Sequence, residues 1–243
     1  MSRLGTGHPD LRVSEGALGR LAWERGDAPR AVSHLRAALA RADRSPDQNH
    51  VLATRLALAE VLLASGRAAE ALPLLQQAAR QPAPGRRGQP MSHQAMQGQI
   101  QRLLGEAARA LGDTAAARVH LHAAVRLTRA GYGPAHAQSR LAQYALARYD
   151  AQSGDPAGLA RLDALARAPG AGGPMDAVHA LALGAAAQVR CRGPESDSAL
   201  RSLDTVMAAL RSQQPDGGAL TREVAAIHAG CTGRVFPVAR LLR

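Results

Sequence analysis

Apolar residues recur at intervals of three and four along most of the chain, which is the period of a helix with one buried face. Leu56, Ala59 and Leu62 follow this period before Gly66, and Leu75 and its neighbours follow it afterwards. The pattern predicts two helices joined by a tight turn, because glycine suits the left-handed residue that ends a helix. Neither helix can bury its apolar stripe alone, so such units must stack on one another.

The turn signal recurs at nearly constant spacing, so the chain consists of repeats. The turn glycines are separated by 40, 46, 42, 39 and 40 residues and are Gly26, Gly66, Gly112, Gly154, Gly193 and Gly233. The sequence therefore predicts an all-α, right-handed α-solenoid that occupies residues 1–243 as a single domain. Its five repeats and partial sixth are expected at about 5–45, 46–90, 91–132, 133–174, 175–213 and 214–243.

Small residues and leucines occupy fixed places relative to the turn glycines. Leu104 and Gly105 stand eight and seven places before Gly112, and Ala117 and Leu121 stand five and nine places after it. This register resembles the tetratricopeptide repeat, with its Leu-Gly pair in the first helix and its spaced small residues in the second. HEAT and armadillo repeats match the period but lack this register.

The period of about 42 residues points to a subclass, because most tetratricopeptide repeats are about 34 residues long. Residues 5–10 and 133–136 each begin 21 places before a turn glycine. Both resemble the Gly-x-x-His-Pro-Asp lead-in of kinesin-light-chain-type repeats, although Ala137 stands where proline would. We expect His8 and His136 of these lead-ins to cap a helix or to pack between repeats. The resemblance also implies that such an array in bacteria often follows a regulatory or kinase domain.

Composition supports the helical interpretation and excludes several enzyme classes. The chain has 54 Ala and 32 Leu but only 2% aromatic residues, which favours helix over strand. Its 30 basic side chains are all Arg, which indicates the codon bias of a GC-rich genome. Without lysine there is no phosphate-loop or Schiff-base lysine and no kinase strand lysine.

Positive charge is concentrated in the middle of the chain. Residues 71–149 contribute +8 of the net charge of +11, while both ends are almost balanced. This leaves nucleic-acid binding as an alternative function. Single-strand binders need stacking aromatic residues, however, and the chain has only five.

No constellation for catalysis or metal binding stands out. His120 and His122 form the densest histidine pair, but residues two apart on a helix point to nearly opposite sides. The acidic residues are scattered singly, so no pair of carboxylates is available for acid–base chemistry. We therefore predict that the protein is not an enzyme and binds no cofactor or metal.

Cys191 and Cys231 each stand two places before a turn glycine, 40 residues apart. Equivalent places in successive repeats should separate their Cα atoms by one repeat step of about 10 Å, which is too far for a disulfide. No signal peptide or membrane span is visible in the sequence. The expected location is the cytoplasm, with reduced thiols.

The candidate binding residues follow from the family resemblance. In tetratricopeptide arrays the first helices line a concave groove, and the places ten, six, three and two before the turn glycine tend to face it. Arg and large aromatic residues dominate binding energy at interfaces, and the guanidinium fork suits carboxylates. These positions predict a cationic groove for an acidic partner segment, formed by Arg20, Trp23, Arg102, Arg109, Tyr144, Arg148 and Arg190.

The leading hypothesis is a protein–protein interaction scaffold with no membrane partner. The alternatives are a nucleic-acid-binding helical repeat, or the C-terminal regulatory region of a larger signalling protein such as a bacterial Ser/Thr kinase or transcriptional regulator. Residues 235–243 are too short for a full second helix, so the chain either ends in a makeshift cap or is a piece of something longer. We expect the second-helix stripe to be a solvated face: Arg118, His122, Arg126 and Arg129.

Overall fold

The structure is a computed structural model that describes residues 9–42, 48–81, 90–168, 177–191, 193–213 and 218–232. Within these ranges it contains eleven α-helices and no strand, which confirms the all-α prediction. The expectations for the lead-in at 5–8, for His8 and for the C-terminal residues 235–243 fall outside the described residues. So does most of each glycine- and proline-rich segment near 82–89 and 169–176.

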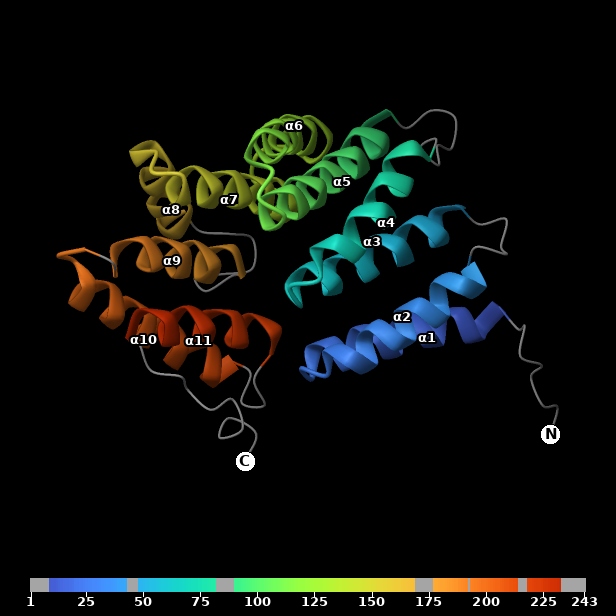
Figure 1. Cartoon of the computed structure of the whole chain (residues 1–243), viewed down its shortest axis with the longest axis horizontal. Coiled ribbons are helices and arrows are strands. Elements are labelled where there is room, and N and C mark those ends of the chain that lie inside the picture. The colour runs from blue at the N-terminus through green and yellow to red at the C-terminus, as the bar shows by residue number, and fades with distance from the viewer. Residues whose placement is uncertain are drawn as a thin grey trace. The chain divides into compact units, whose positions relative to one another are not determined.

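The chain divides into two compact units, Met1–Ala124 and Val125–Arg243 (Figure 1). The boundary falls within helix α6 (Thr114–Tyr132). Each unit is described by itself below. The prediction of a single solenoid over residues 1–243 stays a prediction.

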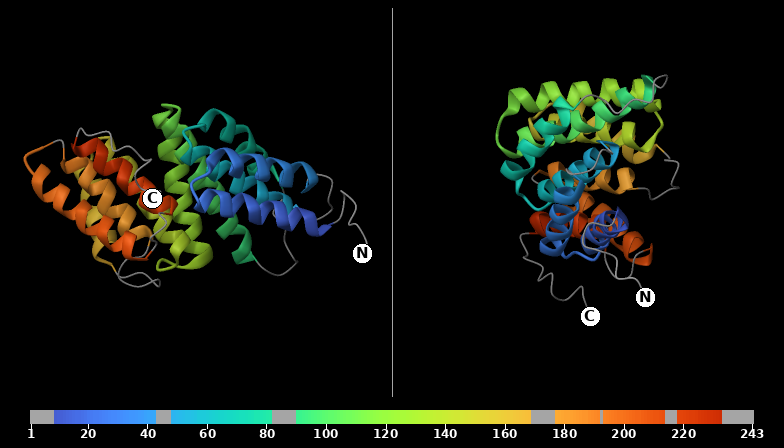
Figure 2. Two further views of the ribbon diagram at one scale, coloured as in Figure 1. Left: turned by 90° about the horizontal axis from the view of Figure 1, so that it is seen from below. Right: turned by 90° about the vertical axis from the view of Figure 1, so that its right-hand side faces the viewer.

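Unit 1 consists of helices that pack on their neighbours in chain order. Both views of Figure 2 show α1 and α2 side by side. Helix α3 also packs on α1 and on α5, so the first helices of the three repeats form one row. Besides the start of α6, the helices are α1 (Pro9–Glu24), α2 (Ala28–Ala42), α3 (Gln48–Ala64), α4 (Ala68–Arg80) and α5 (Pro90–Ala110).

The turns follow the predicted pattern. Gly26, Gly66, Gly112 and Gly154 all have φ between 74° and 86°, a region that side chains with a Cβ disfavour. In each case the second helix begins two residues later. The fifth turn is longer, because α10 (Ser196–Gln213) begins three residues after Gly193. This turn is one residue longer than the first four.

Close approach of the two helices in a repeat depends on the small residue seven places before the turn. A Cβ placed on Gly105 of α5 would lie 2.7 Å from Leu121 Cγ of α6, and one on Gly19 of α1 would lie 2.7 Å from Leu35 Cγ of α2. Both leucines are buried. In these two repeats the Leu-Gly register therefore marks contact between the backbone of the first helix and a leucine side chain of the second.

We expect Gly105→Ala to destabilise unit 1. Alanine favours helix over glycine by about 1 kcal/mol, but overpacking against Leu121 should cost more, giving a net loss of about 1 kcal/mol. Urea unfolding followed by the fluorescence of Trp23 measures the change, since this is the only Trp in the chain. Gly16→Ala is the control, because a Cβ there would have no neighbour within 4 Å. If both substitutions stabilise the unit, the close approach is not a constraint.

Unit 2 is arranged around helix α9. This helix packs on each of the other four complete helices of the unit. Its small residues allow this: a Cβ on Gly184 would lie 3.1 Å from Ile227 Cδ1 of α11, and Ala180 and Ala187 are buried on the same helix. With α10, the helices of the unit are α7 (Ala137–Gln152), α8 (Pro156–Arg167), α9 (Ala177–Arg190) and α11 (Ala219–Thr232).

Polar side chains complete the helix ends of unit 2. His136 is the N-cap of α7, where its Nδ1 accepts from the backbone N–H of Gln138 at 3.2 Å. Its ring also stacks on that of Tyr132, with centroids 4.2 Å apart. This confirms the capping role expected of His136. At the same open end of the α7–α8 hairpin, the buried Arg140 donates to the carbonyl of Ala168 at 3.0 Å, so α7 also caps the end of α8.

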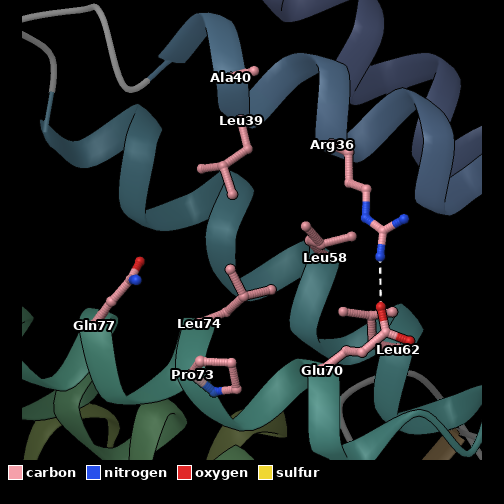
Figure 3. Close-up of a pocket in the computed structure, with 9 residues that line it drawn as sticks. All are labelled: Arg36, Leu39, Ala40, Leu58, Leu62, Glu70, Pro73, Leu74 and Gln77. Atoms are coloured by element: carbon pink, nitrogen blue, oxygen red, sulfur yellow. Dashed lines mark hydrogen bonds and ion pairs between the residues drawn. The ribbon is translucent and has the colours of Figure 1, made fainter.

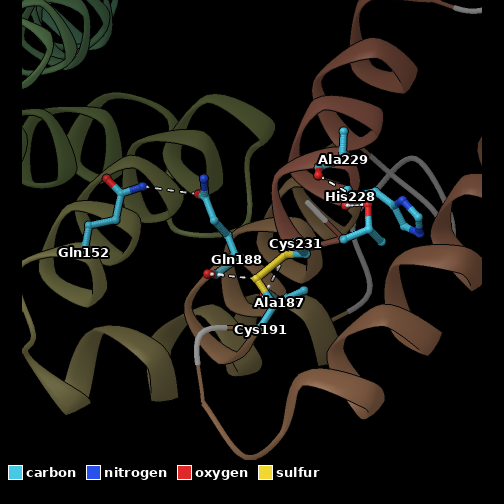
Figure 4. Close-up of a disulfide and its surroundings, with 8 residues drawn as sticks. Gln152, Ala187, Gln188, Cys191, His228, Ala229 and Cys231 are labelled. Carbon is cyan, nitrogen blue, oxygen red and sulfur yellow. Dashed lines mark hydrogen bonds between the residues drawn. A yellow bond between two sulfur atoms is a disulfide. The ribbon is translucent and has the colours of Figure 1, made fainter. Parts of the chain in front are cut away.

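The expectation that the two cysteines cannot pair is wrong. Cys191 follows α9 and Cys231 lies in the last turn of α11; they form a disulfide with Cα atoms 5.5 Å apart (Figure 4). The assumed step of about 10 Å is a distance between helix axes, whereas two residues on facing sides of adjacent helices can lie much closer. Gly184 and Ala187 on α9 add to this, because small side chains let α11 approach.

Reducing this disulfide should destabilise unit 2. The bond closes a loop with a sequence separation of 40 residues, so its loss should lower the free energy of unfolding by about 3–4 kcal/mol. Far-UV circular dichroism of the full chain, with and without reductant, should show a transition that shifts to lower temperature. The signal of Trp23 in unit 1 should change less. Cys191→Ser/Cys231→Ser should unfold like the reduced protein; insensitivity of the wild type to reductant would contradict the prediction.

Candidate functional site

Arg102, a predicted groove residue, lies in an ion-pair network within unit 1. Its side chain is only 7% exposed and donates to the carboxylates of Glu60 on α3 and Glu106 on α5, each at 2.8 Å. Burial alone would lower the pKa of this guanidinium, but the charges of Glu106 and Glu60 outweigh it and raise the pKa. Arg102 therefore stays charged and connects two neighbouring first helices.

Tyr144 and Arg148 of α7 come together in unit 2. The Arg148 guanidinium carbon lies 5.3 Å from the centroid of the Tyr144 ring, and Nη1 donates to the Tyr144 hydroxyl at 3.1 Å. The same nitrogen lies 3.5 Å from a carboxylate oxygen of Glu223 on α11. Tyr144 is buried, so its ring supports Arg148 from below the surface.

Arg190, at the end of α9, has two acidic partners. It donates to both carboxylate oxygens of Asp163 on α8, at 2.9 and 2.6 Å, and lies 3.0 Å from Glu195. The hydrogen bonds that Arg190 donates to Asp163 raise the pKa of Arg190 against the opposing effect of burial, and Glu195 adds to this. A bidentate pair of this kind fixes the geometry of both side chains. Arg190 therefore ties α9 to α8.

The remaining predicted residues differ in what they offer to a partner. Arg20 is exposed and has no hydrogen bond or ion pair to any described residue. Trp23 is half-buried and packs against the core of unit 1. Arg109 is half-buried and has a partner within the chain. Partner binding by the seven predicted residues stays a prediction, and these placements indicate that Arg20 is the most available of them.

The inner positions of unit 1 are balanced in charge. Glu60, which the sequence interpretation missed, stands six places before Gly66, at the same place in its repeat as Arg20. The repeat register therefore contained the signal for it. Asp163 and Glu223 of unit 2 had no such signal, because helix packing alone brings them to Arg190 and Arg148. The charged inner positions of α1, α3 and α5 are three positive and three negative: Arg20, Glu24, Glu60, Arg102, Glu106 and Arg109.

Helix α3 carries an accessible stripe between these charges. Ala53, Glu60 and Ala64 are exposed and Ala57 is half-buried, at spacings of four, three and four residues that place them on one side of the helix. The rest of this helix is mostly buried. We call these four residues the inner stripe of α3. It lies on the middle of three adjacent first helices, and its small side chains leave the helix backbone accessible.

Uncompensated positive charge lies on the second helices instead. Arg80 of α4 is exposed, and so are the α6 residues Arg118, Arg126 and Arg129; none has an ion pair or hydrogen bond to a described residue. This is the solvated face that the sequence predicted for α6. His120 and His122 of this helix do not form a joint site, because the His120 ring is hydrogen-bonded to Gln101 of α5 at 2.7 Å. Across the described residues, no three His, Cys, Asp or Glu side chains are grouped as metal ligands would be.

Arg102→Ala should destabilise unit 1 by about 2 kcal/mol, because Glu106 would be left largely buried without its counter-charge. The loss should be smaller than for a fully buried pair, since Glu60 is 53% exposed. Arg118→Ala, which removes an exposed and unpaired guanidinium, should change stability by no more than about 0.5 kcal/mol. Chemical denaturation of both variants provides the comparison. Equal losses would mean that the network does not hold α3 to α5.

The geometry defines a class of protein: a chain of stacked antiparallel helix pairs with an accessible inner row. Residues 10–81 match the family model of the tetratricopeptide repeat. None of the described helices is long and apolar enough to cross a membrane. A comparison with curated proteins finds no significant match.

Solved structures extend the same fold over the rest of the chain. One solved structure contains nearly identical TPR-like repeats of a kinesin light chain named from Podosopora anserina. It is 22% identical in sequence to this chain, with a TM-score of 0.54, and the match covers 85% of this chain and 98% of that one. The structure of a variant of those repeats is 21% identical to this chain, with a TM-score of 0.55, and the match covers 86% of this chain and 98% of that one. A Rap protein complexed with Competence and Sporulation Factor is 12% identical, with a TM-score of 0.73. That match covers 99% of this chain and 64% of the Rap protein. The tetratricopeptide-like fold predicted from the register is confirmed.

Proposed function

We propose that the protein is a protein–protein interaction scaffold that binds a segment of its partner along the inner stripe of α3. The observation that carries this proposal is the accessible row of small residues on the middle helix of unit 1. A partner backbone can approach α3 closely at Ala53, Ala57 and Ala64. Its side chains would then reach the charged positions of α1 and α5, where ion pairs and hydrogen bonds can select a sequence.

The charge of the partner segment follows from the same surface. The sequence favoured an acidic partner, but an acidic segment would have to compete with Glu60 and Glu106 for Arg102. Arg20 and Arg109 would attract carboxylates, while Glu24 and Glu106 would repel them. We therefore propose a partner segment of mixed charge for unit 1, with its acidic residues placed opposite Arg20.

The fold comparisons support the general role. The Rap protein structure contains the Competence and Sporulation Factor as its partner, so an array of this fold can hold another molecule. A fold is compatible with many functions, so the argument for binding rests on the accessible residues of this chain. The described residues provide no cluster of ligands for a metal-dependent function.

Blocking the inner stripe should abolish partner capture. Ala53→Arg/Ala64→Arg places two long side chains on the stripe. Both positions are exposed, and arginine favours helix, so α3 should stay folded. The full chain, immobilised as bait, is exposed to nuclease-treated lysate, and retained proteins are quantified by mass spectrometry. We expect the inner variant to retain the specific partner at least about tenfold less than wild type does, which corresponds to about 1.4 kcal/mol.

The matched control is Ala69→Arg/Ala115→Arg, which adds the same side chains at exposed positions of α4 and α6. It should retain the partner as wild type does. Equal retention by the two double variants would rule out the inner stripe. Capture that disappears when nuclease is added would instead favour the nucleic-acid alternative, which the exposed arginines of α6 make the next candidate.

A further inference from the structure

The disulfide of unit 2 joins the last described helix to the rest of its unit. Cys191 follows the end of α9 and Cys231 lies in the last turn of α11, and these are the only cysteines of the chain. Both residues are half-buried, so solvent reaches this end of the two helices. A disulfide within reach of an external thiolate is open to thiol–disulfide exchange.

Apart from this bond, little of α11 is buried. Only Thr221 and Val224 of its fourteen residues are buried, and the partly buried Ile227 packs beside them. Helix α4 of unit 1, by contrast, buries four of its thirteen residues. Figure 3 shows that Glu70 of α4 is also bound to Arg36 of α2, at 2.6 Å. The apolar contact that holds α11 is therefore small for the length of the helix.

One of the two buried side chains of α11 opposes its docking. Thr221 is 3% exposed, and its hydroxyl has no hydrogen-bond partner among the described residues. A buried polar group without a partner costs free energy, because water satisfies the same group when it is exposed. The docked position of α11 therefore carries a cost that a released helix avoids.

The ion pairs between α11 and other helices are open to solvent. Glu223 lies 3.5 Å from Arg148 of α7 and is 45% exposed. His228 lies 3.0 Å from Asp204 of α10, whose side chain is 70% exposed. Exposed pairs of this kind contribute little to stability. The disulfide therefore supplies a large part of what keeps α11 on α9.

We propose that Cys191 and Cys231 form a reversible redox site, at which a dithiol reductant opens the disulfide and releases α11 from α9. A thiolate of the dithiol attacks one sulfur, which breaks the S–S bond and leaves the other cysteine as a thiolate. The second thiol of the reductant then attacks the mixed disulfide and releases the first cysteine. Two electrons pass to the protein, whose cysteines take up the two protons that the dithiol loses, and the dithiol becomes a cyclic disulfide.

Release of α11 changes two surfaces of unit 2. On α9 it uncovers the small residues Gly184 and Ala187, which belong to the contact with α11. On α7 it removes Glu223 from Arg148, a predicted partner-binding residue, so this guanidinium becomes available to a carboxylate of another molecule. The redox site therefore controls access to Arg148, and it does so independently of the inner stripe of α3 in unit 1.

Hydrogen exchange of the full chain, read by mass spectrometry of peptic fragments, tests the proposal. The protein is equilibrated with reduced or oxidised dithiothreitol, and alkylation of free thiols verifies the state of the cysteines. We expect fragments of α11 to exchange at least about tenfold faster in the reduced protein and to regain protection on reoxidation. Fragments of α7 and α8 should change by less than about twofold, because these helices pack on each other and on α9.

Variants separate release of one helix from general destabilisation. Thr221→Val removes the hydroxyl that has no partner, so α11 of the reduced variant should exchange about threefold more slowly than α11 of the reduced wild type. Thr205→Val on α10 is the control, because its exposed hydroxyl donates to the carbonyl of Arg201 at 2.9 Å. Cys191→Ser/Cys231→Ser should match the reduced wild type and not respond to reductant. The comparison of reduced and reoxidised wild type does not depend on the folding of any variant.

Three results would overturn the proposal. One is a disulfide that excess dithiothreitol opens only after unit 2 is unfolded with denaturant, which would make it a purely structural bond. Another is equal acceleration of exchange in all helices from α7 to α11, which would mean that reduction releases no single helix. The last is unchanged exchange of α11 after complete reduction, which would mean that packing alone holds the helix.

Discussion

The close contact between a glycine of the first helix and a leucine of the second is the constraint on which the packing of the first and third repeats depends. At Gly19 and Gly105 the absence of a Cβ lets Leu35 and Leu121 lie directly against the helix backbone. This contact sets the distance between the two helices of a repeat and therefore which residues remain on the outside. The same device acts between repeats in unit 2, where Gly184 and Ala187 of α9 admit α11 and bring Cys231 to Cys191.

Tight packing also determines which arginines are paired with carboxylates. A guanidinium near the core must have acceptors for its hydrogen bonds, because burying an unsatisfied charge is costly. Arg102, Arg148 and Arg190 meet this requirement with carboxylates from other helices. These carboxylates offset the charge of the three arginines, and the ion pairs hold neighbouring helices together. Arg80 of α4 and Arg118 of α6, in contrast, are exposed and have no ion pair to a described residue, so unpaired positive charge lies on these second helices of unit 1.

The chemistry of the proposed binding surface of unit 1 follows from this distribution of charge. The inner stripe of α3 is shallow, lined by alanines and flanked by balanced charges, so it suits a segment selected by hydrogen bonds and mixed charges.

The sequence by itself determined the helical class, the repeat register, the turn glycines and the capping role of His136, because these depend on residues close together in the chain. Even Glu60 could have been found by comparing equivalent places between repeats. The ion pairs of Arg148 and Arg190 and the bond between Cys191 and Cys231 were decided only by tertiary structure. Each joins different helices, and the angle and distance at which two helices pack depend on side-chain volumes along the whole contact, which no local pattern records.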